Sequence, residues 1–598
     1  MSDSSPHSFY EKKRLQHVQA LQLLKRKQNL LGWIRLAIII LTAVLAYFVF
    51  SSLGIWGWVV VAAGITGFLV IVSIDASNNS AIAYTTNLIE INEVELSVLQ
   101  HKYQHLYGGS AYQPSDHAYA ADIDLFGKSS LFQLINRCQT EQGRSLLASN
   151  LTHPLIVQQV SDRQVAIKEI APLLEWRQAF QATAMSTPIN QAIQQKITNW
   201  LHQDDSSFTD SKWRYILPVY SCVTIISAIA AILDYIPTPV FSFLFLVYFL
   251  TGTFFSKQVM KVYMQLSGNV QSVDTLSELI RCIEGQHFNS PLLTSLQKGI
   301  QINQQKAYSQ IKELKEILNR FDLRLNVFVF IVLNSFLLWD VRQMRTLNQW
   351  KAKNKSVIPK AFSAIAEFEV VNSLATLHFN EPGWAMPTFA DYFTLQGTAI
   401  GHPLLAASKR VTSDFSLVGK GKIALVTGSN MAGKSTFLRS LAINQVLAQI
   451  GAPVCASRFT LSAMELMSSM RIADNLAENT STFYAELKKL ESIITAVKLH
   501  KPMFVVLDEI LRGTNSLDRH IGSKALIRQL IKEEAVAIIA THDIELTKLQ
   551  EEFGNAIENY HFDVQVENGE LYFDYKLKQG VCHSLNASLL MKKIGIEI

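Results

Sequence analysis

The sequence is poor in cysteine, and its cysteines are not arranged in pairs. Only five occur among 598 residues, and no C-x-x-C motif is present. This pattern excludes a C-x-x-C zinc site and argues against a disulfide framework, so a reducing compartment is the simplest setting. The five are Cys138, Cys222, Cys282, Cys455 and Cys582.

The sequence also lacks a strong net charge. Its 54 Lys and Arg residues exceed its 49 Asp and Glu residues only slightly, which gives a net charge of +5. Part of this excess is concentrated near the N-terminus. The overall charge therefore gives no independent argument for a nucleic-acid partner.

Charged residues are nearly absent from two long stretches. Residues 36–74 contain none, and this length accommodates two membrane-spanning helices of about 20 residues with a turn near residues 51–54. Within residues 215–255 the only charged residue is Asp234, close to the prolines of residues 237–239, where we expect a reversal. The two stretches predict two transmembrane hairpins.

A cleavable signal peptide is missing as well, because the basic N-terminal region is long and the first apolar segment exceeds a typical h-region. Cations flank both hairpins, and the positive-inside rule assigns these flanks to the cytoplasm. We therefore predict a multi-pass membrane protein with four spans and with a cytoplasmic N-terminus and C-terminal region. Residues 1–35 are basic and amphipathic, and we expect them to lie along an anionic membrane surface. The flanking cations are Lys12, Lys13, Arg14, Lys25, Arg26, Lys27, Arg35, Lys212, Arg214, Lys257 and Lys261.

One further apolar run is too short for a span. Residues 325–339 include Asn326 and Asn334, whereas a span requires about 20 predominantly apolar residues. A fifth span would also place the C-terminal region on the opposite side of the membrane from the N-terminus. We therefore predict a buried core helix here, and membrane embedding stays the open alternative.

The periodicity of apolar residues changes along the chain. Outside the hairpins it is helical up to about residue 390, and beyond this point β-rich runs alternate with helices. The runs include residues 423–426, 504–507 and 535–540, and Asn568-Gly569 predicts a β-hairpin. The predicted fold class is multi-domain, with transmembrane helical hairpins, an all-α domain and a C-terminal α/β domain. In order, the predicted regions are a basic cytoplasmic leader (1–35), a first transmembrane hairpin (36–74), a helical linker (75–124), a first helical segment (125–214), a second transmembrane hairpin (215–255), a second helical segment (256–390) and the α/β domain (391–598).

The α/β domain contains a glycine-bounded loop between an apolar strand and a helix. Residues 428–435, G-S-N-M-A-G-K-S, fit the phosphate-binding pattern G-x-x-x-x-G-K-[ST]. Such a loop surrounds a polyphosphate with backbone N–H groups and the positive end of a helix dipole. Lys434 would reach the β- and γ-phosphates of ATP and Ser435 would ligate Mg²⁺, while a glycine turn before an ordinary helix is the alternative. The predicted nucleotide-binding residues here are Gly428, Ser429, Asn430, Met431, Ala432, Gly433, Lys434, Ser435 and Thr436.

Two other predicted strands end in residues with catalytic chemistry. Residues 504–507 are followed by Asp508, which would hold the Mg²⁺ shell, and by Glu509, which would polarise the attacking water. His542 follows another strand and would reach a γ-phosphate. Each could be a plain strand end. Together with Lys434 they fit the rule that α/β sites form at the carboxyl ends of strands, so we predict Lys434, Glu509 and His542 as catalytic.

Five motifs of this region together resemble the ATPase domain of the MutS mismatch-repair family. They are T-G-S-N-M-A-G-K-S-T (427–436), R-I-A-D-N-L (471–476), S-T-F-Y-A-E (481–486), L-D-E-I-L-R-G-T-N-S (507–516) and A-T-H-D-I-E-L-T (540–547). The resemblance is strong in the last 200 residues or so and weaker back to residue 125, where it implies that the two helical segments are core and lever regions. It implies an ABC-type ATPase in which two subunits, here a homodimer, enclose two nucleotides. It further implies that Asn430 senses the γ-phosphate and that Ser481 contacts the nucleotide of the other protomer.

The sequence departs from the family in informative places. Ser429 replaces the usual proline of the loop, and Leu511 replaces a glycine after the Asp-Glu pair. No mismatch-reading domain fits ahead of residue 125. Residues 9–11, Phe-Tyr-Glu, match the family's Phe-x-Glu wedge, but they lie in the basic leader and not on a folded domain.

The leading hypothesis is a membrane-anchored MutS-like ATPase that binds and hydrolyses ATP with Mg²⁺ at a composite dimer interface. Membrane lipid is then a partner, and coupling to matched or mismatched DNA is left open. One alternative is an ABC-like membrane transporter, which the few spans and the lack of an L-S-G-G-Q stretch disfavour. The other is an ATP-gated scaffold without hydrolysis or a DNA role.

Overall fold

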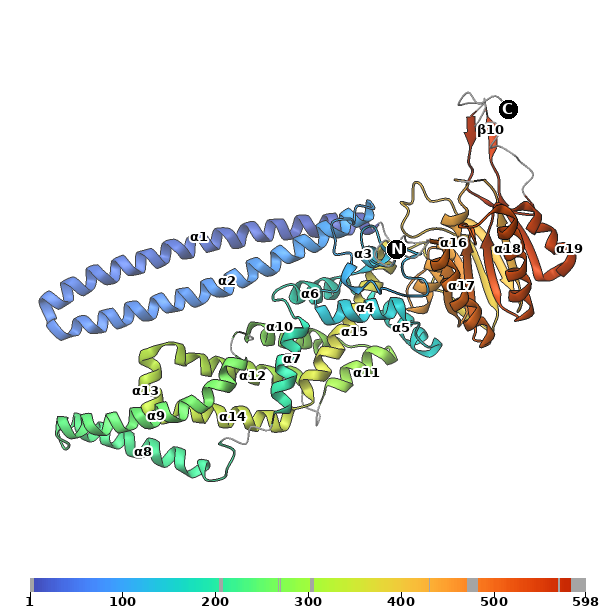
Figure 1. The fold of residues 1–598 in the computed structure, drawn as a ribbon. Helices are drawn as coiled ribbons and strands as arrows, with labels where there is room; N and C mark the ends of the chain where they lie inside the picture. Colours follow the sequence, from blue (N-terminus) through green and yellow to red (C-terminus); the bar gives the residue numbers. More distant parts are fainter. Residues whose placement is uncertain are drawn as a thin grey trace. The chain divides into compact units, whose positions relative to one another are not determined.

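The computed structural model describes residues 5–203, 208–266, 268, 270–301, 306–429, 431–470, 482–567 and 570–581. The chain forms two compact units, each described by itself (Figure 1). The first comprises Met1–Glu93, Cys138–Gly143 and Leu173–Glu369, and the second comprises Val94–Arg137, Arg144–Pro172 and Val370–Ile598.

The first unit begins with two long helices that lie side by side as an antiparallel pair (Figure 1). Helix α1 (Pro6–Leu53) and helix α2 (Gly57–Leu99) are joined by the short 3-10 helix Gly54–Trp56. The Ser5 side chain caps α1 and Pro6 occupies its first turn, which is a common way to begin a helix.

The basic leader and the first apolar run are one continuous helix. The leader and α2 are joined by polar contacts: Asn78 Nδ2 of α2 donates to the Leu24 carbonyl oxygen at 3.1 Å, and an Arg14 amino group lies 3.8 Å from a Glu93 oxygen. Residues 6–35 therefore pair with a second helix along their length. That residues 1–35 lie along an anionic membrane surface stays a prediction; in the structure, residues 6–35 belong to the α1–α2 pair.

The rest of the first unit is helical, as the sequence predicts. Its centre is an aromatic cluster in which Trp176 stacks on Phe180 with ring centroids 5.3 Å apart, and Phe288 packs on Phe368 at 5.4 Å. The helices are α6 (Leu174–Ala184), α7 (Gln191–His202), α8 (Trp213–Ile232), α9 (Thr238–Leu266), α10 (Val270–Gly285), α11 (Pro291–Ile300), α12 (Ala307–Asp322), α13 (Val327–Leu337), α14 (Trp339–Asn354) and most of α15 (Val357–Asn380).

Three helical segments among the described residues are long and apolar enough to cross a membrane: Pro6–Leu99, α8 and α9. Helices α13 and α14 together would make a fourth, but they are bent by 79°. The prediction of a buried core helix at residues 325–339 is wrong, since α13 buries only Asn334 and Ser335, exposes Val327, Phe328 and Val332, and leaves its other apolar side chains only partly buried.

The second unit is built on two sheets. The larger has the strand order β12-β9-β4-β8-β7-β6, with every neighbouring pair parallel except β12 with β9. The runs predicted near residues 423–426, 504–507 and 535–540 are its strands β4, β7 and β8. The strands are β4 (Ile423–Thr427), β6 (Glu465–Ser469), β7 (Met503–Asp508), β8 (Val536–Ala540), β9 (Ile557–Phe562) and β12 (Leu577–Gln579).

The smaller sheet has the order β1-β5-β2-β3 and consists of β1 (Thr388–Ala390), β2 (Thr394–Ile400), β3 (Ser413–Val418) and β5 (Arg458–Ser462). Strands β10 (Gln565–Glu567) and β11 (Glu570–Tyr572) pair antiparallel, which confirms the predicted hairpin. The remaining helices are α3 (Leu131–Ile135), α4 (Glu141–Thr152), α5 (Val157–Ile170), α16 (Lys434–Gln449), α17 (Thr482–Lys498), α18 (Ser516–Lys532) and α19 (Leu549–Phe553).

Candidate functional site

The glycine-bounded loop connects β4 to the N-terminus of α16. Gly428 has a φ of +144° and Gly433 a φ of +107°, a region that side chains rarely adopt. A Cβ at Gly428 would also lie 2.8 Å from the Phe562 carbonyl oxygen, so only glycine fits there. The loop thus delivers Lys434 and Ser435 to the first turn of α16, whose N–H groups form an anion site.

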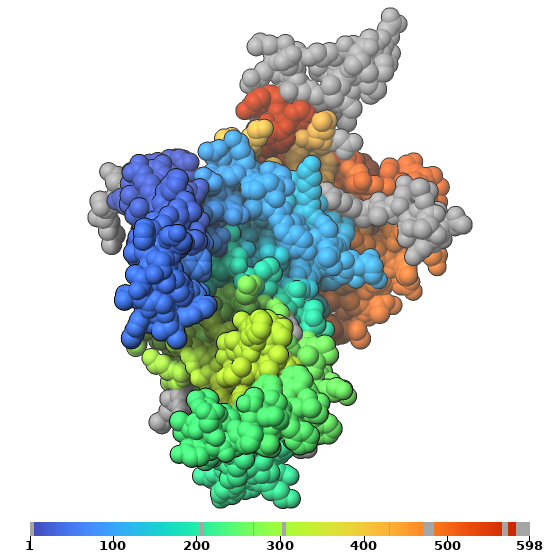
Figure 2. All heavy atoms as spheres, turned by 90° about the vertical axis from the view of Figure 1, so that its left-hand side faces the viewer, coloured from blue at the N-terminus to red at the C-terminus, as the bar shows by residue number. Residues whose placement is uncertain are grey.

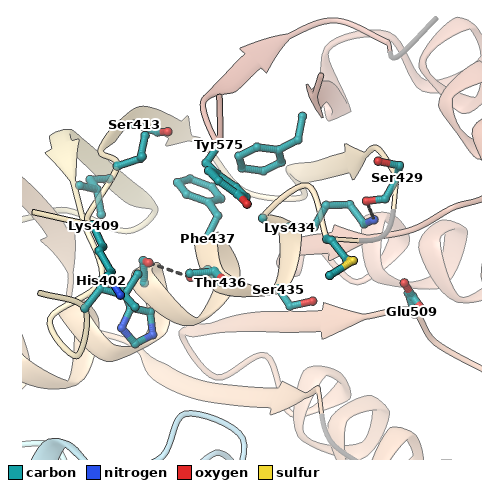
Figure 3. A pocket seen from close by; sticks show the side chains of 17 residues that line it. His402, Lys409, Ser413, Ser429, Lys434, Ser435, Thr436, Phe437, Glu509 and Tyr575 are labelled. Carbon is teal, nitrogen blue, oxygen red and sulfur yellow. Dashed lines mark hydrogen bonds between the residues drawn. The ribbon is translucent and has the colours of Figure 1, made fainter. Parts of the chain in front are cut away.

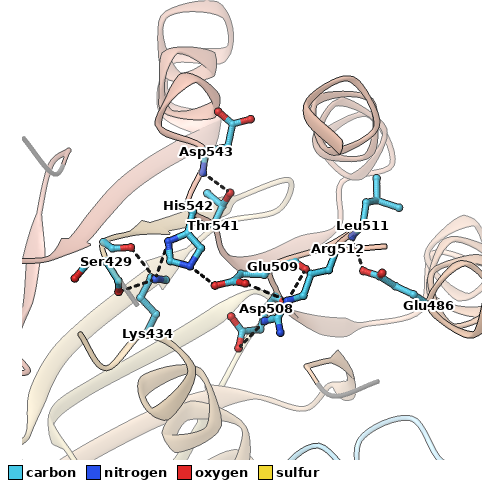
Figure 4. Close-up of polar contacts among 11 residues, drawn as sticks. Ser429, Lys434, Glu486, Asp508, Glu509, Leu511, Arg512, Thr541, His542 and Asp543 are labelled. Atoms are coloured by element: carbon cyan, nitrogen blue, oxygen red, sulfur yellow. Dashed lines mark hydrogen bonds and ion pairs between the residues drawn. The ribbon is translucent and has the colours of Figure 1, made fainter. Parts of the chain in front are cut away.

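Lys434 is buried, and its ammonium group spans the loop (Figure 4). Its Nζ donates to the carbonyl oxygens of Gly428 at 2.7 Å and Ser429 at 3.0 Å, and lies 3.4 Å from His542 Nδ1. The Ser429 hydroxyl is buried without a hydrogen-bond partner among the described residues. A cation and a hydroxyl thus lie in a loop built for phosphate, and proline, the family's usual residue, would lack that hydroxyl.

Glu509 lies between two basic side chains at the end of β7 (Figure 4). Its carboxylate pairs with His542 Nε2 on one side and with Arg512 Nε, at 3.1 Å, on the other. Its backbone N–H donates to the Ala540 carbonyl oxygen at 2.9 Å, which ties the end of β7 to the end of β8. The register of the parallel strands therefore brings Lys434, Glu509 and His542 together.

Asp508, the last residue of β7, is buried, and its Oδ1 has no hydrogen-bond partner within the stretches of chain that the structure describes. An uncompensated carboxylate oxygen is costly unless a cation or donor reaches it. Carboxylate and hydroxyl oxygens are also the ligand types that Mg²⁺ prefers. The donor set of Asp508 and Ser435 fits the predicted metal.

A cavity of about 400 Å³ opens beside the loop (Figure 3), within the usual size of small-molecule sites, about 300 to 1,000 Å³. Its lining combines the loop and Glu509 with side chains from other parts of the second unit. One of them is His402 of the stretch His402-Pro403-Leu404-Leu405, where the MutS resemblance continues upstream. Burial lowers the pKa of His402 to about 4, so its ring is neutral at physiological pH. The lining residues are Ile400, His402, Leu405, Lys409, Val411, Ser413, Ser429, Met431, Gly433, Lys434, Ser435, Thr436, Phe437, Ser440, Glu509, Phe562 and Tyr575.

Helix α17 is tied to the segment after β7 through a buried glutamate. The Glu486 carboxylate accepts the backbone N–H of Leu511, and burial raises the pKa of Glu486. Leu511 has a φ of +59°, where the family's glycine would be unstrained. A Cβ at Gly513 would lie 2.6 Å from the Phe483 side chain. Phe483 and Glu486 of the S-T-F-x-x-E motif therefore pack directly on the residues that follow the Asp-Glu pair.

Some predicted residues cannot be placed. Asn430, Ser481 and the motif at residues 471–476 lie outside the described residues. The residues that sequence reasoning missed include Arg512, Lys409 and Tyr575. Arg512 is the arginine within the L-D-E-I-L-R-G motif, which marks its position, whereas no sequence signal singles out Lys409 or Tyr575.

Comparison with known proteins identifies the α/β region of the chain. Residues 424–591 match the family MutS domain V. A DNA mismatch repair protein MutS from Finegoldia magna is 34% identical over 254 residues, which is 41% of this chain and 28% of the relative. A DNA mismatch repair protein MSH3 from Phaeosphaeria nodorum is 31% identical over 264 residues, or 42% of this chain and 23% of the relative. The chain thus spans about a quarter of these relatives, and it carries a MutS domain V ATPase, a P-loop ATP hydrolase.

Proposed function

We propose that this chain is a membrane-anchored MutS-like ATPase that binds and hydrolyses ATP with Mg²⁺ at a site completed by a second copy of the chain. One observation carries the proposal. The carboxyl ends of β4, β7 and β8 bring Lys434, Glu509 and His542 into contact beside a cavity of nucleotide size.

Each residue has a role that its contacts support. Lys434 and the loop N–H groups would bind the β- and γ-phosphates, and His542 would contact the γ-phosphate. Glu509 would hold and polarise the attacking water, while Arg512 and His542 orient its carboxylate from two sides. Ser435 and Asp508 would hold Mg²⁺, which stabilises the negative charge of the transferred phosphoryl group.

The second copy would supply Ser481. Helix α17 begins at Thr482, so Ser481 stands directly before a helix N-terminus, where the helix dipole favours an anion. In the same arrangement Asn430 would sense the γ-phosphate from the loop of its own subunit. The MutS resemblance supports a homodimer through the α/β domain, and the contact between Glu486 and Leu511 would couple Ser481 to the Asp-Glu pair.

Membrane anchoring rests on the two helical hairpins. Pro6–Leu99, α8 and α9 are long and apolar enough to span, and cations flank them. The hairpins would give four spans, with the N-terminus and the α/β domain in the cytoplasm. We further propose that ATP-driven movement of the helical core and lever regions is directed to the second hairpin. The proposal includes no mismatch recognition, because the relatives named for it match only over about a quarter of their length.

The decisive test is Mg²⁺-dependent ATP hydrolysis by the full chain in detergent. Glu509→Gln keeps the size of the side chain but removes the carboxylate that would polarise the attacking water. The variant should retain ATP binding, and its turnover should fall by about 10²-fold or more. Glu551→Gln, on the exposed face of α19, is the matched control and should leave turnover unchanged. Unchanged turnover in Glu509→Gln would overturn the assigned role of Glu509, and a wild-type chain that binds but never hydrolyses ATP would favour the scaffold.

DNA is a separate question with its own measurement. Matched and mismatched duplexes are titrated at two salt concentrations, because phosphate attraction weakens steeply with salt. Equal and strongly salt-sensitive binding to both duplexes would leave no role for mismatch recognition.

A further inference from the structure

Helix α13 buries polar residues and exposes apolar ones, which is the reverse of a helix in a water-soluble protein. Its buried residues are the polar Asn334 and Ser335, whereas Val327 is 64%, Phe328 is 83% and Val332 is 53% exposed. Soluble proteins rarely expose such contiguous apolar surface without a partner for it. The exposed face therefore needs an apolar environment.

The neighbouring helices also bury small and polar residues. Helix α8 buries Ser221, Thr224 and Ser227 besides Leu217. Helix α9 buries Gly252 and Ser256 together with Tyr248 and, in its last turns, Val259, Val262 and Leu266. Figure 2 shows this region of the first unit, coloured green to yellow-green, at the molecular surface. Many large apolar side chains of these two helices are exposed: Val219, Val223, Ile226, Ile232, Val240, Phe243, Leu246, Leu250 and Phe254.

Polar side chains of α8 donate hydrogen bonds to the last carbonyl oxygens of α13, and a polar side chain of α13 donates to a carbonyl oxygen of α9. Tyr220 Oη donates to the Ser335 carbonyl oxygen at 2.9 Å, and Thr224 Oγ1 donates to that of Phe336 at 2.7 Å. Asn334 Nδ2 donates to the Gly252 carbonyl oxygen at 2.9 Å. The last carbonyls of a helix lack intrahelical partners, and away from water only protein donors can replace them.

The two ends of α13 are joined by charged residues. Arg324, before the helix, lies 3.5 Å from Asp340, after it, and Asp340 Oδ2 accepts the Ser256 hydroxyl at 2.6 Å. Leu338 has a φ of +47°, and there the chain bends by 79° into α14. In Figure 1, α13 runs across α9 and α14 runs back along it. Both ends of α13 are therefore held together by the Arg324–Asp340 pair, beside Ser256 of α9.

The length of α13 excludes a full crossing. Its 11 residues extend about 16 Å at 1.5 Å per residue, half of the roughly 30 Å hydrocarbon layer. Trp339 stands two residues after it, and its Nε1 donates to the Arg320 carbonyl oxygen at 3.0 Å. A tryptophan next to arginines is typical of the membrane interface.

We propose that α13 is embedded in the cytoplasmic leaflet without crossing it, with lipid acyl chains as the occupant of its exposed face. This proposal rests on the membrane anchoring proposed above. Together with α8 and α9, α13 then forms a three-helix membrane element. Because α13 joins α12 to α14, this element is continuous with the helical core.

The test uses the full chain in vesicles of phosphatidylcholine and phosphatidylglycerol that carry a phosphatidylcholine with a photoreactive diazirine in its acyl chain. After illumination, peptide mapping should find lipid adducts on α13 at residues 327–332 as well as on α8 and α9. Adducts on α8 and α9 alone would overturn the proposal for α13 and leave the anchoring intact. Adducts on none of the three would overturn the anchoring itself.

Two further measurements sharpen the result. Phe328→Asp should remove the adducts from α13 and preserve those on α8 and α9, whereas Phe328→Leu should preserve both sets; Phe328 contributes little packing, so its loss spares the fold. A membrane-impermeant amine reagent should modify Lys312 and Lys353, on the two sides of α13, from the same compartment. Modification from opposite compartments would show that α13 crosses the membrane and would contradict the proposal.

Discussion

In the larger sheet of the second unit, strands β4, β7 and β8 bury all of their residues, most of them valine, isoleucine, leucine and alanine. In the first unit, helices α8 and α13 bury serine, threonine and asparagine and expose residues of those same apolar types. The two regions therefore contain similar residues with opposite placement.

The difference agrees with the proposed membrane anchoring, in which the sheet is surrounded by water and the helices by lipid. Parallel strands covered on both faces gain stability by removing apolar surface from water. Helices in lipid gain nothing from hiding apolar surface, so small and polar side chains form their contacts with one another. The proposed nucleotide chemistry then belongs to the region whose core excludes water, and the proposed anchoring belongs to the other. The predictions below break or sharpen this division, from the largest expected effect to the smallest.

Lys434→Ala should have the largest effect, because it removes the cation that the loop carbonyls hold and that we propose to bind the phosphates. We expect a fall in turnover of about 10²- to 10³-fold, the size seen when one such electrostatic contact is lost. Mg²⁺-dependent phosphate release and binding of a fluorescent ATP analogue measure it. Lys420→Ala, at an exposed lysine before β4, is the matched control. Unchanged nucleotide affinity in Lys434→Ala would remove the basis of the proposed function.

The sequence predicts the loop and the strands around it well, for a physical reason. A buried parallel strand is a continuous apolar run, and Gly428 and Gly433 stand where side chains do not fit. Both signals are local, so β4, α16, β7 and β8 follow from short stretches of sequence.

Contacts between distant residues leave no such signal. Tyr575 reaches the cavity beside Gly433 although more than a hundred residues separate them. The burial of Asp508 Oδ1 and the contact of Glu486 with Leu511 likewise depend on how strands and helices pack. The prediction of a buried core helix at residues 325–339 was wrong because the composition of an apolar run of this length does not show whether its side chains are buried or exposed.

A second prediction concerns acid sensitivity of the second unit. His402 has a folded-state pKa of about 4 because burial disfavours its cation, whereas an unfolded histidine titrates near 6.5. The unfolded state therefore binds more protons between these values, and the free energy of unfolding should fall as pH drops from 6.5 to 4. His402 accounts for on the order of 3 kcal/mol of this loss.

His402→Asn should reduce the loss of stability at acid pH, because asparagine does not titrate. The fold should be preserved, because the asparagine oxygen can still accept the Leu404 backbone N–H that His402 Nδ1 accepts at 3.2 Å. The urea midpoint of the second unit, measured by pulse proteolysis at several pH values, reports it. His500→Asn, at an exposed histidine, serves as the control. A wild-type acid profile in His402→Asn would mean that other groups cause the acid sensitivity.

A third prediction tests how residues 118–124 are held on the α/β domain. The buried Asp122 carboxylate accepts the Ser468 hydroxyl at 2.6 Å and pairs with Lys489 of α17 at the same distance. Asp122→Asn removes the charge and should destabilise the second unit by about 2 kcal/mol. The urea midpoint measures this, with the exposed Asp116→Asn as the control. Equal midpoints for the two variants would show that the Lys489 pair adds no stability.

The smallest effect should come from the α1–α2 pair, where Arg35 lies 3.2 Å from Asp75 at the end of the uncharged stretch. Asp75 is buried, whereas about a third of the Arg35 side chain is exposed, so solvent weakens the pair and Asp75→Asn should cost only about 1 kcal/mol. Hydrogen exchange of α1 and α2 peptides, with the protein in vesicles, would show faster exchange near residue 75, and Glu90→Gln on the same helix would not.

Asp75→Asn also tests the comparison of the two regions, because it changes a charge only in the first unit and leaves the nucleotide site of the second unit unchanged. Turnover of ATP by Asp75→Asn should match the wild-type chain if hairpin stability and nucleotide chemistry are separate properties. Slower turnover with unchanged ATP affinity would instead mean that the α1–α2 pair influences the hydrolytic step. Helix α2 is continuous from Gly57 to Leu99 and leads directly into the second unit, so such an effect has a structural route.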